Sequence, residues 1–413
     1  MKYDLFSFYA LVYHIITKDF DSQLYMERRK AMAEMSATQN PGKKLSEMNN
    51  KPSVKNIPPS PKPPMGNVTG SEKKPPKKAI KTTKGPVGLD IGTSHVVVAT
   101  KDGETVNIAT ELNAFYAVEA TKMIVTTFKA QNIPFFEYQG QCYTMGFASQ
   151  HFANIFHKAL RRPIYGGIVS PDEEEGIKVI QNIIDNVLPK PENFSETLCF
   201  GVPGEPIEGS GSVVFHTEVI KRFIGGFGFK PIPINEGMAV VMSELEDESY
   251  TGIGISCGGG MCNICLSYLS VPVITFSIRK SGDYINQRAA ESVGESETKM
   301  KILKEEELDL AQRAPDRYHM ALHIFYDDMI TYLIQSIRNV ISQSTRMPTI
   351  SQPIPIILSG GTVLPNGFLN KFNKILKQHP LPIEISKVSI ADKPLETTAR
   401  GALKVAIAEK EGA

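Results

Sequence analysis

A short turn between two apolar runs carries the side chains best suited to chemistry. The segment Gly88-Leu-Asp-Ile-Gly-Thr-Ser-His95 places a carboxylate, a glycine and two hydroxyls between these runs. This pattern predicts a β-hairpin whose tip presents backbone N–H groups and hydroxyls. The glycine lets a phosphate approach the backbone, and Asp90 can hold the water shell of a Mg²⁺ ion. The segment therefore indicates a nucleotide-phosphate site, although such hairpins also occur without a ligand.

Two further glycine turns follow similar apolar runs. Gly258-Gly-Gly260 lies between the apolar runs Gly252–Cys257 and Asn263–Leu269, and Gly360 and Gly361 follow a third apolar run. Two hairpins, one in each half of the chain, can close on a triphosphate from both sides. A double glycine after a buried strand lets the backbone pack flat against a planar base.

Alternating strands and helices must position these turns, and their order indicates an α/β protein with mixed sheets. The expected strands are Val87–Ile91, Val96–Thr100, Thr105–Ile108, Met123–Thr127, Thr197–Val202, Gly252–Cys257, Asn263–Leu269, Val271–Ser277 and Ile354–Leu358. The expected helices are Glu173–Val187, Glu218–Gly225, Asn235–Glu244, Tyr284–Val293, His319–Gln343, Gly367–Gln378 and Thr397–Ala408.

Composition and charge separate a large body from a basic segment. The chain has 413 residues, 41% of them hydrophobic, and a net charge of +1. Lys43–Lys84 holds eleven Lys and two Glu, so it carries +9, residues 1–42 are balanced, and the remainder carries −8. An acidic body argues against nucleic acid as a partner. Five cysteines without paired spacing suit a reducing cytoplasm.

The first 85 residues are expected to be a disordered, Lys/Pro-rich extension. Lys51–Pro76 contains eight prolines and almost no large apolar residues, so it cannot bury enough surface to fold. The apolar stretch Leu5–Ile16 is too short to span a bilayer. Two alternatives stay open. Either this stretch and the basic tail bind an anionic membrane surface, or residues 1–25 precede the true start of translation.

Several segments, in order, resemble motifs of the actin, sugar-kinase and heat-shock chaperone ATPase superfamily, in the form found in bacterial actins of the MreB and MamK type. Asp90–His95 resembles the first phosphate motif, Gly258–Gly260 the second, Ser359–Thr362 the adenosine motif, and Phe200–Gly204 and Ala399–Ala402 the two segments that connect the domains. Arg162–Val169, Asn235–Ala239 and Ser281–Asp283 are similar to further segments of bacterial actins.

The resemblance implies a two-lobed actin-like ATPase fold, in which each lobe is a mixed β-sheet flanked by helices and the nucleotide cleft lies between them. Domain I is expected over residues 86–210 and 390–413, and domain II over residues 211–389. The stretch from Asp283 to Gly360 is shorter than in MreB-like proteins. We therefore expect the outer subdomain of the second lobe to be reduced.

The resemblance also assigns the site. It implies ATP and Mg²⁺ as cofactors, with Asp90 holding the metal through water and Glu205 and Glu208 as candidate catalytic residues. The residues expected to bind nucleotide are Asp90, Gly92, Thr93, Ser94, His95, Glu236, Gly258, Gly259, Gly260, Gly282, Asp283, Lys304, Gly360, Gly361 and Thr362.

The second phosphate motif departs from the family pattern. Ser256 stands where the family has an Asp that helps to position Mg²⁺, Met261 where it has a hydroxyl, and Asn263 where it has another Asp. Serine lacks the fixed charge that Mg²⁺ prefers, and methionine cannot donate to a phosphate. Both losses should impair hydrolysis more than binding. ATPase activity is therefore left undecided between slow turnover and none.

Two functions fit these observations. One is a bacterial actin homologue that forms or organises cytoskeletal filaments, for cell shape or organelle positioning, through ATP-dependent domain closure. The other is a non-polymerising actin-fold adaptor, similar to PilM or EutJ, that binds ATP with little or no hydrolysis. The expected partners are other copies of the chain or a scaffold protein. The expected location is the cytoplasm, with attachment to an anionic membrane surface as an alternative.

Overall fold

The computed structural model describes residues 82–155, 160–169, 175–208, 213–345 and 347–412. The predicted N-terminal extension lies almost wholly outside these residues. Its last part does not, because Thr82–Thr83 forms β1 and pairs in parallel with β10, Lys190–Pro191. None of the helices in the described part of the chain is both long and apolar enough to cross a membrane.

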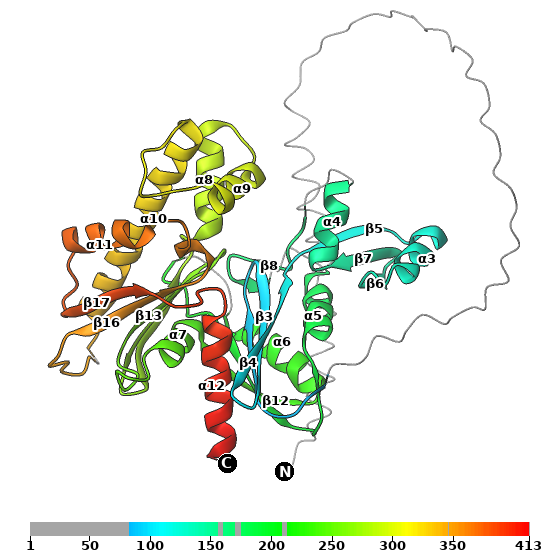
Figure 1. Ribbon diagram of the computed structural model, residues 1–413, viewed down its shortest axis with the longest axis horizontal. Coiled ribbons are helices and arrows are strands. Elements are labelled where there is room, and N and C mark those ends of the chain that lie inside the picture. Colours follow the sequence, from blue (N-terminus) through cyan, green and yellow to red (C-terminus); the bar gives the residue numbers. More distant parts are fainter. Residues whose placement is uncertain (1–81, 156–159, 170–174, 209–212, 346, 413) are drawn as a thin grey trace, which may run out of the picture. The chain divides into compact units, whose positions relative to one another are not determined.

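Two five-stranded sheets share one topology and form two lobes (Figure 1). In each sheet three consecutive strands form an antiparallel meander, and two later strands add in parallel beside the first strand. The first-lobe sheet has the order β12-β11-β2-β3-β4, with β2 Val87–Ile91, β3 His95–Asp102, β4 Thr105–Leu112, β11 Glu196–Val202 and β12 Phe229–Asn235. The second-lobe sheet has the order β15-β14-β13-β16-β17, with β13 Gly252–Cys257, β14 Cys262–Tyr268, β15 Val271–Ile278, β16 Ile354–Ser359 and β17 Ile385–Ile390.

Helices cover both faces of each sheet, because side chains along a strand alternate between faces. In β3, Val96 and Val98 pack with one cluster, which includes residues of α5 and α6, while Val97 packs on the opposite face with Leu403 of α12. The helices of the first sheet are α5 Gly176–Val187, α6 Val213–Gly226 and α12 Thr397–Glu411. The helices of the second are α7 Glu236–Glu244, α8 Gly282–Val293, α9 Glu297–Glu306, α10 Arg317–Gln343 and α11 Phe368–Gln378.

The helices α7 and α12 lie between the two sheets and pack directly on each other. Their contact needs a glycine, because a Cβ added at Gly401 would lie 1.8 Å from the carbonyl oxygen of Ala239. The first lobe extends past the predicted boundary at residue 210, since α6 packs in its core and β12 pairs with β11. The inter-lobe packing of α7 and α12 sets the spacing of the two sheets.

A small three-stranded sheet follows β4 in the chain. It has the order β5-β7-β6 and is flanked by two short helices. Its elements are β5 Phe115–Glu119, α3 Lys122–Ala130, β6 Phe135–Tyr138, β7 Gln141–Met145 and α4 Phe147–Ile155. The hairpin of β8 Ile164–Tyr165 and β9 Ile168–Val169 comes next along the described chain.

The strand expected over Met123–Thr127 is wrong, because α3 occupies these residues. Thr121 caps the helix by accepting a hydrogen bond from the backbone N–H of Ile124 at 3.2 Å. Phe128 is buried against Phe135 and against α4. The cap and this packing outweigh the strand preference of the β-branched residues in the run.

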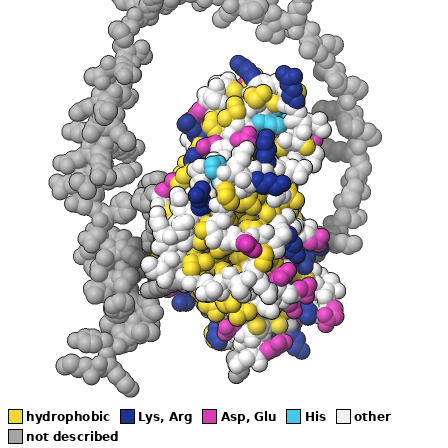
Figure 2. Space-filling model, turned by 90° about the vertical axis from the view of Figure 1, so that its left-hand side faces the viewer, with side chains coloured by type: hydrophobic (Ala, Val, Ile, Leu, Met, Phe, Trp, Pro, Cys, Tyr) yellow, Lys and Arg dark blue, Asp and Glu magenta, His cyan; other side chains and the backbone are white. Residues whose placement is uncertain are grey.

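In the second lobe, α9 is the only regular element between α8 and α10, where every residue of the chain is described. The reduced outer subdomain expected from the sequence is therefore what the structure shows. Figure 2 shows the face of this lobe, on which basic and acidic side chains are interspersed with apolar ones. Exposed apolar side chains of α9 and α10 include Ile302, Met320 and Ile324.

Candidate functional site

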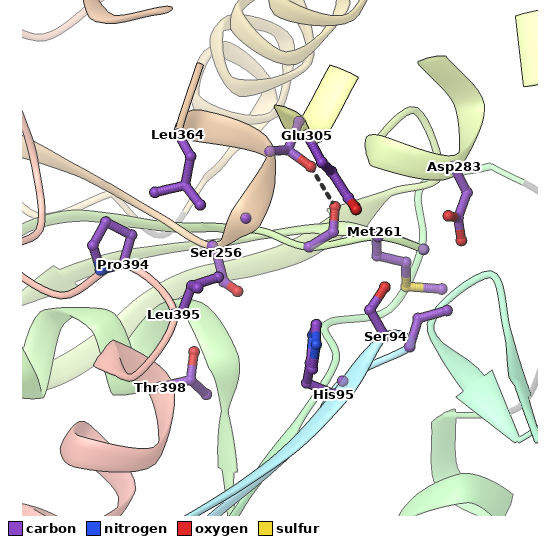
Figure 3. A pocket seen from close by; sticks show the side chains of 18 of the residues that line it. Ser94, His95, Ser256, Met261, Asp283, Glu305, Leu364, Pro394, Leu395 and Thr398 are labelled. Carbon is purple, nitrogen blue, oxygen red and sulfur yellow. Dashed lines mark hydrogen bonds between the residues drawn. The ribbon is translucent and has the colours of Figure 1, made fainter. Parts of the chain in front are cut away.

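A cavity of about 620 Å³ lies between the two lobes, and all three predicted glycine turns line it (Figure 3). The first turn, Asp90–His95, joins β2 to β3, and the second turn, Gly258–Met261, joins β13 to β14. The third turn, Gly360–Thr362, follows β16. The repeated sheet topology explains this convergence, because it brings equivalent strand ends of both lobes to one cleft.

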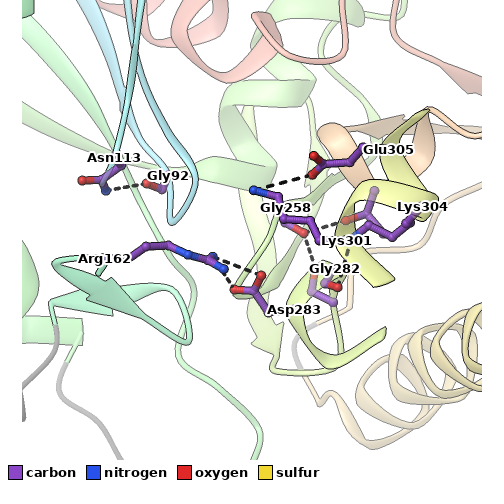
Figure 4. A network of polar contacts seen from close by, with 11 residues as sticks. Gly92, Asn113, Arg162, Gly258, Gly282, Asp283, Lys301, Lys304 and Glu305 are labelled. Carbon is purple, nitrogen blue, oxygen red and sulfur yellow. Dashed lines mark hydrogen bonds and ion pairs between the residues drawn. The ribbon is translucent and has the colours of Figure 1, made fainter. Parts of the chain in front are cut away.

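Asn113 holds the first turn in place. Its side-chain amide donates to the carbonyl oxygen of Gly92 at 2.8 Å (Figure 4). Its backbone N–H donates to the carbonyl oxygen of Ser94 at 2.9 Å. Asn113 is fully buried. Asn113 is not among the residues predicted from the sequence, since an asparagine after a strand carries no distinctive signal.

The second turn is tied to α8 and to the third turn through its carbonyl groups. The carbonyl oxygen of Gly258 accepts from the hydroxyls of Ser281 at 2.6 Å and Thr362 at 2.7 Å. The backbone N–H of Asp283 donates to the carbonyl oxygen of Gly259 at 2.8 Å. Three segments that the sequence predicts to bind nucleotide are thus held together by direct hydrogen bonds.

The first and second turns lie against each other at one end of the cavity. A Cβ added at Gly259 would lie 2.9 Å from the hydroxyl oxygen of Ser94, and one added at Gly260 would lie 2.5 Å from that of Thr93. Only glycine fits at these two positions without displacing the facing hydroxyl. The turns therefore form a pair of backbone-rich loops that contact each other at this end of the cavity.

A pair of partly buried carboxyl groups faces the cavity, Asp90 from the first turn and Glu236 from the start of α7. Burial raises the pKa of Asp90 well above its usual range, and the carboxylate of Glu236 raises it further. Burial raises the pKa of Glu236 to about 7, against the opposing effect of hydrogen bonds from Ser256 and Asn263. Among the described residues, Oδ1 of Asp90 is buried without a hydrogen-bond partner. In the described part of the chain, no Lys, Arg or His side chain forms an ion pair with either carboxyl group.

Ser256 and Asn263 support this pair. The hydroxyl of Ser256 and the side-chain amide of Asn263 both donate to Oε2 of Glu236, at 3.2 Å and 2.8 Å. The second carboxylate of the site thus comes from α7, and the two altered residues of β13 and β14 orient it. Met261 is 2% exposed and packs with Ile168 and Val213, so it forms an apolar contact between the lobes.

Basic groups lie at the edge of the second turn. Lys304 of α9 donates to the carbonyl oxygen of Gly282 at 3.0 Å, and burial lowers its pKa to about 8, while Asp283 and Glu305 act in the opposite direction. Gly282 does not line the cavity but lies directly behind it. Burial also lowers the pKa of His95, which lines the cavity.

The third turn brings the backbone of two strands close together. Gly360 has a φ of +91°, and a Cβ there would lie 2.3 Å from the carbonyl oxygen of Cys257, so this position requires glycine. Leu364, Pro394 and Leu395 line the cavity beside it. These three side chains make this end of the cavity more apolar than the end formed by the first two turns.

The structure does not bring Glu205 and Glu208 into the cavity. In the described part of the chain, neither is among the lining residues. Glu205 is exposed, and Glu208 accepts a hydrogen bond from the hydroxyl of Tyr332 at 2.6 Å. The segment around them pairs instead with the edge strand β15, through an isolated bridge between Pro206 and Ser277. Glu236 is the glutamate that faces Asp90.

In the described part of the chain, protein side chains alone do not form a complete metal centre. The described residues contain no group of three or more His, Cys, Asp or Glu side chains placed to hold one ion. Two carboxyl groups with an unpartnered oxygen fit a hard cation that keeps most of its water ligands, as Mg²⁺ does.

Solved structures with the same architecture identify the fold. The chain is similar to the MamK double helical filament, with a TM-score of 0.57 and 16% identity over 78% of this chain and 99% of MamK. It is similar to MreB 5 of Spiroplasma citri bound to AMPPNP, with a TM-score of 0.58 and 15% identity over 80% and 98% of the two chains. The described body therefore has the two-lobed actin-like ATPase fold, as the sequence predicts.

The sequence profile of the volactin family matches residues 86–406. This chain belongs to the volactin family. The match begins directly after the Lys/Pro-rich segment predicted to be an extension. No curated protein matches the chain.

Proposed function

We propose that this chain binds ATP with Mg²⁺ in the cavity between its two lobes. The observation that carries the proposal is the convergence of three glycine turns on one cavity of about 620 Å³. The first two turns offer backbone groups and hydroxyls to phosphates, and the third, with the apolar side chains beside it, offers a contact to the base. The similar structure of MreB 5 is bound to AMPPNP. So is that of a non-polymerising MamK mutant, which is similar to this chain with a TM-score of 0.50 and 16% identity over 78% of this chain and 98% of that chain.

The charges in the cavity explain why a metal ion would be needed. Acidic side chains that line it outnumber the two lining lysines, so a nucleotide entering alone meets a negative surface. Asp90 and Glu236 fit Mg²⁺ with its water shell, because among the described residues neither carboxyl group has an ion-pair partner and one oxygen of Asp90 has no hydrogen-bond partner. When bound, the ion would neutralise charge on the phosphates and on the pair.

Within this proposal, Glu236 is the residue placed to accept a proton from an attacking water. It faces the cavity together with Asp90, and hydrogen bonds from Ser256 and Asn263 orient its carboxylate. Glu205 and Glu208, which the sequence suggests, lie outside the cavity. Slow turnover fits a site in which Ser256 orients this glutamate rather than holding charge of its own.

We propose further that nucleotide binding closes the cleft and favours assembly into filaments. A nucleotide between the turns contacts both lobes and so changes how strongly they are held together. The MamK structure, which is similar to this chain, is a double helical filament. Assembly of this chain with other copies is therefore the first candidate for its function, for shaping a cell or positioning an organelle.

A non-polymerising adaptor that binds ATP is the second candidate. It is favoured by Met261, which packs between the lobes instead of offering a hydroxyl to a phosphate. It is also favoured by the small outer part of the second lobe, which contains only α9. In this case the partner is a scaffold protein in the cytoplasm, or an anionic membrane contacted by the basic segment Lys43–Lys84.

Sedimentation of the purified full chain with Mg-ATP, with Mg-ADP and with EDTA separates these candidates, when released phosphate is measured in the same tubes. Pelleting that depends on Mg-ATP supports the filament, and saturable ATP binding without pelleting supports the adaptor. Glu236→Gln should abolish phosphate release, whereas Glu205→Gln serves as the matched control and should not. Absence of nucleotide binding in the wild-type protein would contradict both candidates.

A further inference from the structure

An ion pair joins the two lobes at the end of the cavity where the first and second turns meet (Figure 4). The guanidinium of Arg162 lies 2.9 Å and 3.1 Å from the two carboxylate oxygens of Asp283. Arg162 precedes the β8–β9 hairpin of the first lobe, and Asp283 lies in the first turn of α8 in the second. The side chains are 31% and 28% exposed, so a ligand can reach the pair.

Both residues are held in place by their backbones. Arg161, the neighbour of Arg162, exchanges two backbone hydrogen bonds with Phe115 of β5, at 2.9 Å and 3.1 Å. The backbone N–H of Asp283 donates to the carbonyl oxygen of Gly259 in the second turn. The long side chain of Arg162 can therefore change partner without a change in the fold around it.

The carboxylate of Asp283 lies beside the tip of the second turn. A Cβ added at Gly259 would lie 3.6 Å from each carboxylate oxygen of Asp283 and 2.9 Å from the hydroxyl of Ser94. A phosphate bound between the two turns would therefore lie close to Asp283. A carboxylate repels a phosphate at this range, whereas a guanidinium binds one through two parallel N–H···O hydrogen bonds.

We propose that Arg162 is the residue by which this site distinguishes a nucleoside triphosphate from a diphosphate. Without nucleotide, Asp283 holds Arg162 across the cleft. The terminal phosphate of a triphosphate then replaces Asp283 as the partner of the guanidinium, and a diphosphate is too short to do so. This inference rests on the proposed nucleotide site and adds the group that recognises its terminal phosphate.

The test is the ratio of the dissociation constants of AMPPNP and ADP, each measured with Mg²⁺ by calorimetric titration of the full chain. Arg162→Ala should weaken AMPPNP binding by about tenfold or more, the effect of one lost charge-assisted contact, and ADP binding by less than about threefold. Asp283→Asn removes the competing carboxylate, so it should leave AMPPNP binding unchanged or tighter. Arg288→Ala is the matched control, because Arg288 pairs with Glu291 on the same helix.

If AMPPNP binding and ADP binding were weakened equally in both Arg162→Ala and Asp283→Asn, the ion pair would only hold the two lobes together, and the proposal would be overturned. An unchanged ratio in Arg162→Ala would do the same. If Arg162→Ala does not fold, Arg162→Lys keeps the charge and loses the two-pronged geometry, and it should raise the ratio of the AMPPNP to the ADP dissociation constant, as Arg162→Ala would. Failure of the wild-type chain to bind either nucleotide would instead refute the proposed function itself.

Discussion

Replacing Glu236 by Gln should stabilise the nucleotide-free protein at pH 8 but not at pH 5. Burial raises the pKa of this carboxyl from 4.5 to about 7. The folded chain therefore binds more protons than the unfolded chain between these two values, and its stability falls as the pH rises through them. Above pH 7 the buried charge costs about 3 kcal/mol, because one pKa unit corresponds to about 1.4 kcal/mol. The amide removes this charge and keeps an oxygen that can accept from Ser256 and Asn263.

Urea unfolding at the two pH values, without nucleotide or divalent cations, measures this effect. We expect Glu236→Gln to gain about 2–3 kcal/mol at pH 8 and close to nothing at pH 5. Glu205→Gln removes the charge of an exposed glutamate and should change neither value. Equal stabilisation at both pH values, or destabilisation at pH 8, would show that the buried charge is not the cause. The same variant should bind Mg-ATP less tightly, because the stability gained comes from removing a functional group.

Gly401→Ala should destabilise the fold by about 2–4 kcal/mol in the same urea titration, because its Cβ would lie 1.8 Å from the carbonyl oxygen of Ala239. Gly225→Ala on α6 is the control, since its Cβ would meet no atom within 4 Å, and it should be neutral or stabilising. Glu208→Gln should leave ATP affinity and phosphate release unchanged, since this side chain binds Tyr332 outside the cavity, and a loss of phosphate release would restore its catalytic role. Deletion of residues 1–81 should preserve a cooperative melt by calorimetry, and its loss would contradict the interpretation of this segment as an extension.

Short segments with a strong local signal were predictable from the sequence. The apolar runs on either side of Asp90 and of Gly258 appear as β2, β3, β13 and β14, because each run has turn residues next to it. The strand β12 was missed, since Pro231 and Pro233 argue against a strand. They are tolerated because β12 is an edge strand that pairs only with β11. The two prolines are two residues apart, so their backbone nitrogens point to the same side of the strand, away from β11, where no hydrogen bond to a neighbouring strand is needed.

Contacts between distant segments were not predictable. The sequence suggests roles for both Asp90 and Glu236, but only the packing of α7 between the sheets shows that they form one pair. The sequence shows that Ser256 lacks the charge of the Asp found there in the family. It does not show that the hydroxyl of Ser256 orients the carboxylate of Glu236, which comes from another element, α7. Likewise, the motifs that contain Arg162 and Asp283 were noted separately, and nothing in their spacing indicates an ion pair.

Equilibrium binding of Mg-ATP to the wild-type chain and to Asp90→Ala tests whether the cavity is a nucleotide site. We expect saturable binding with one nucleotide per chain, weakened by tenfold or more in the variant, since Asp90 lies in the cavity with an oxygen that has no partner among the described residues. Equal affinity in the two proteins, with the variant folded, or no binding by either, would contradict a nucleotide site between the lobes.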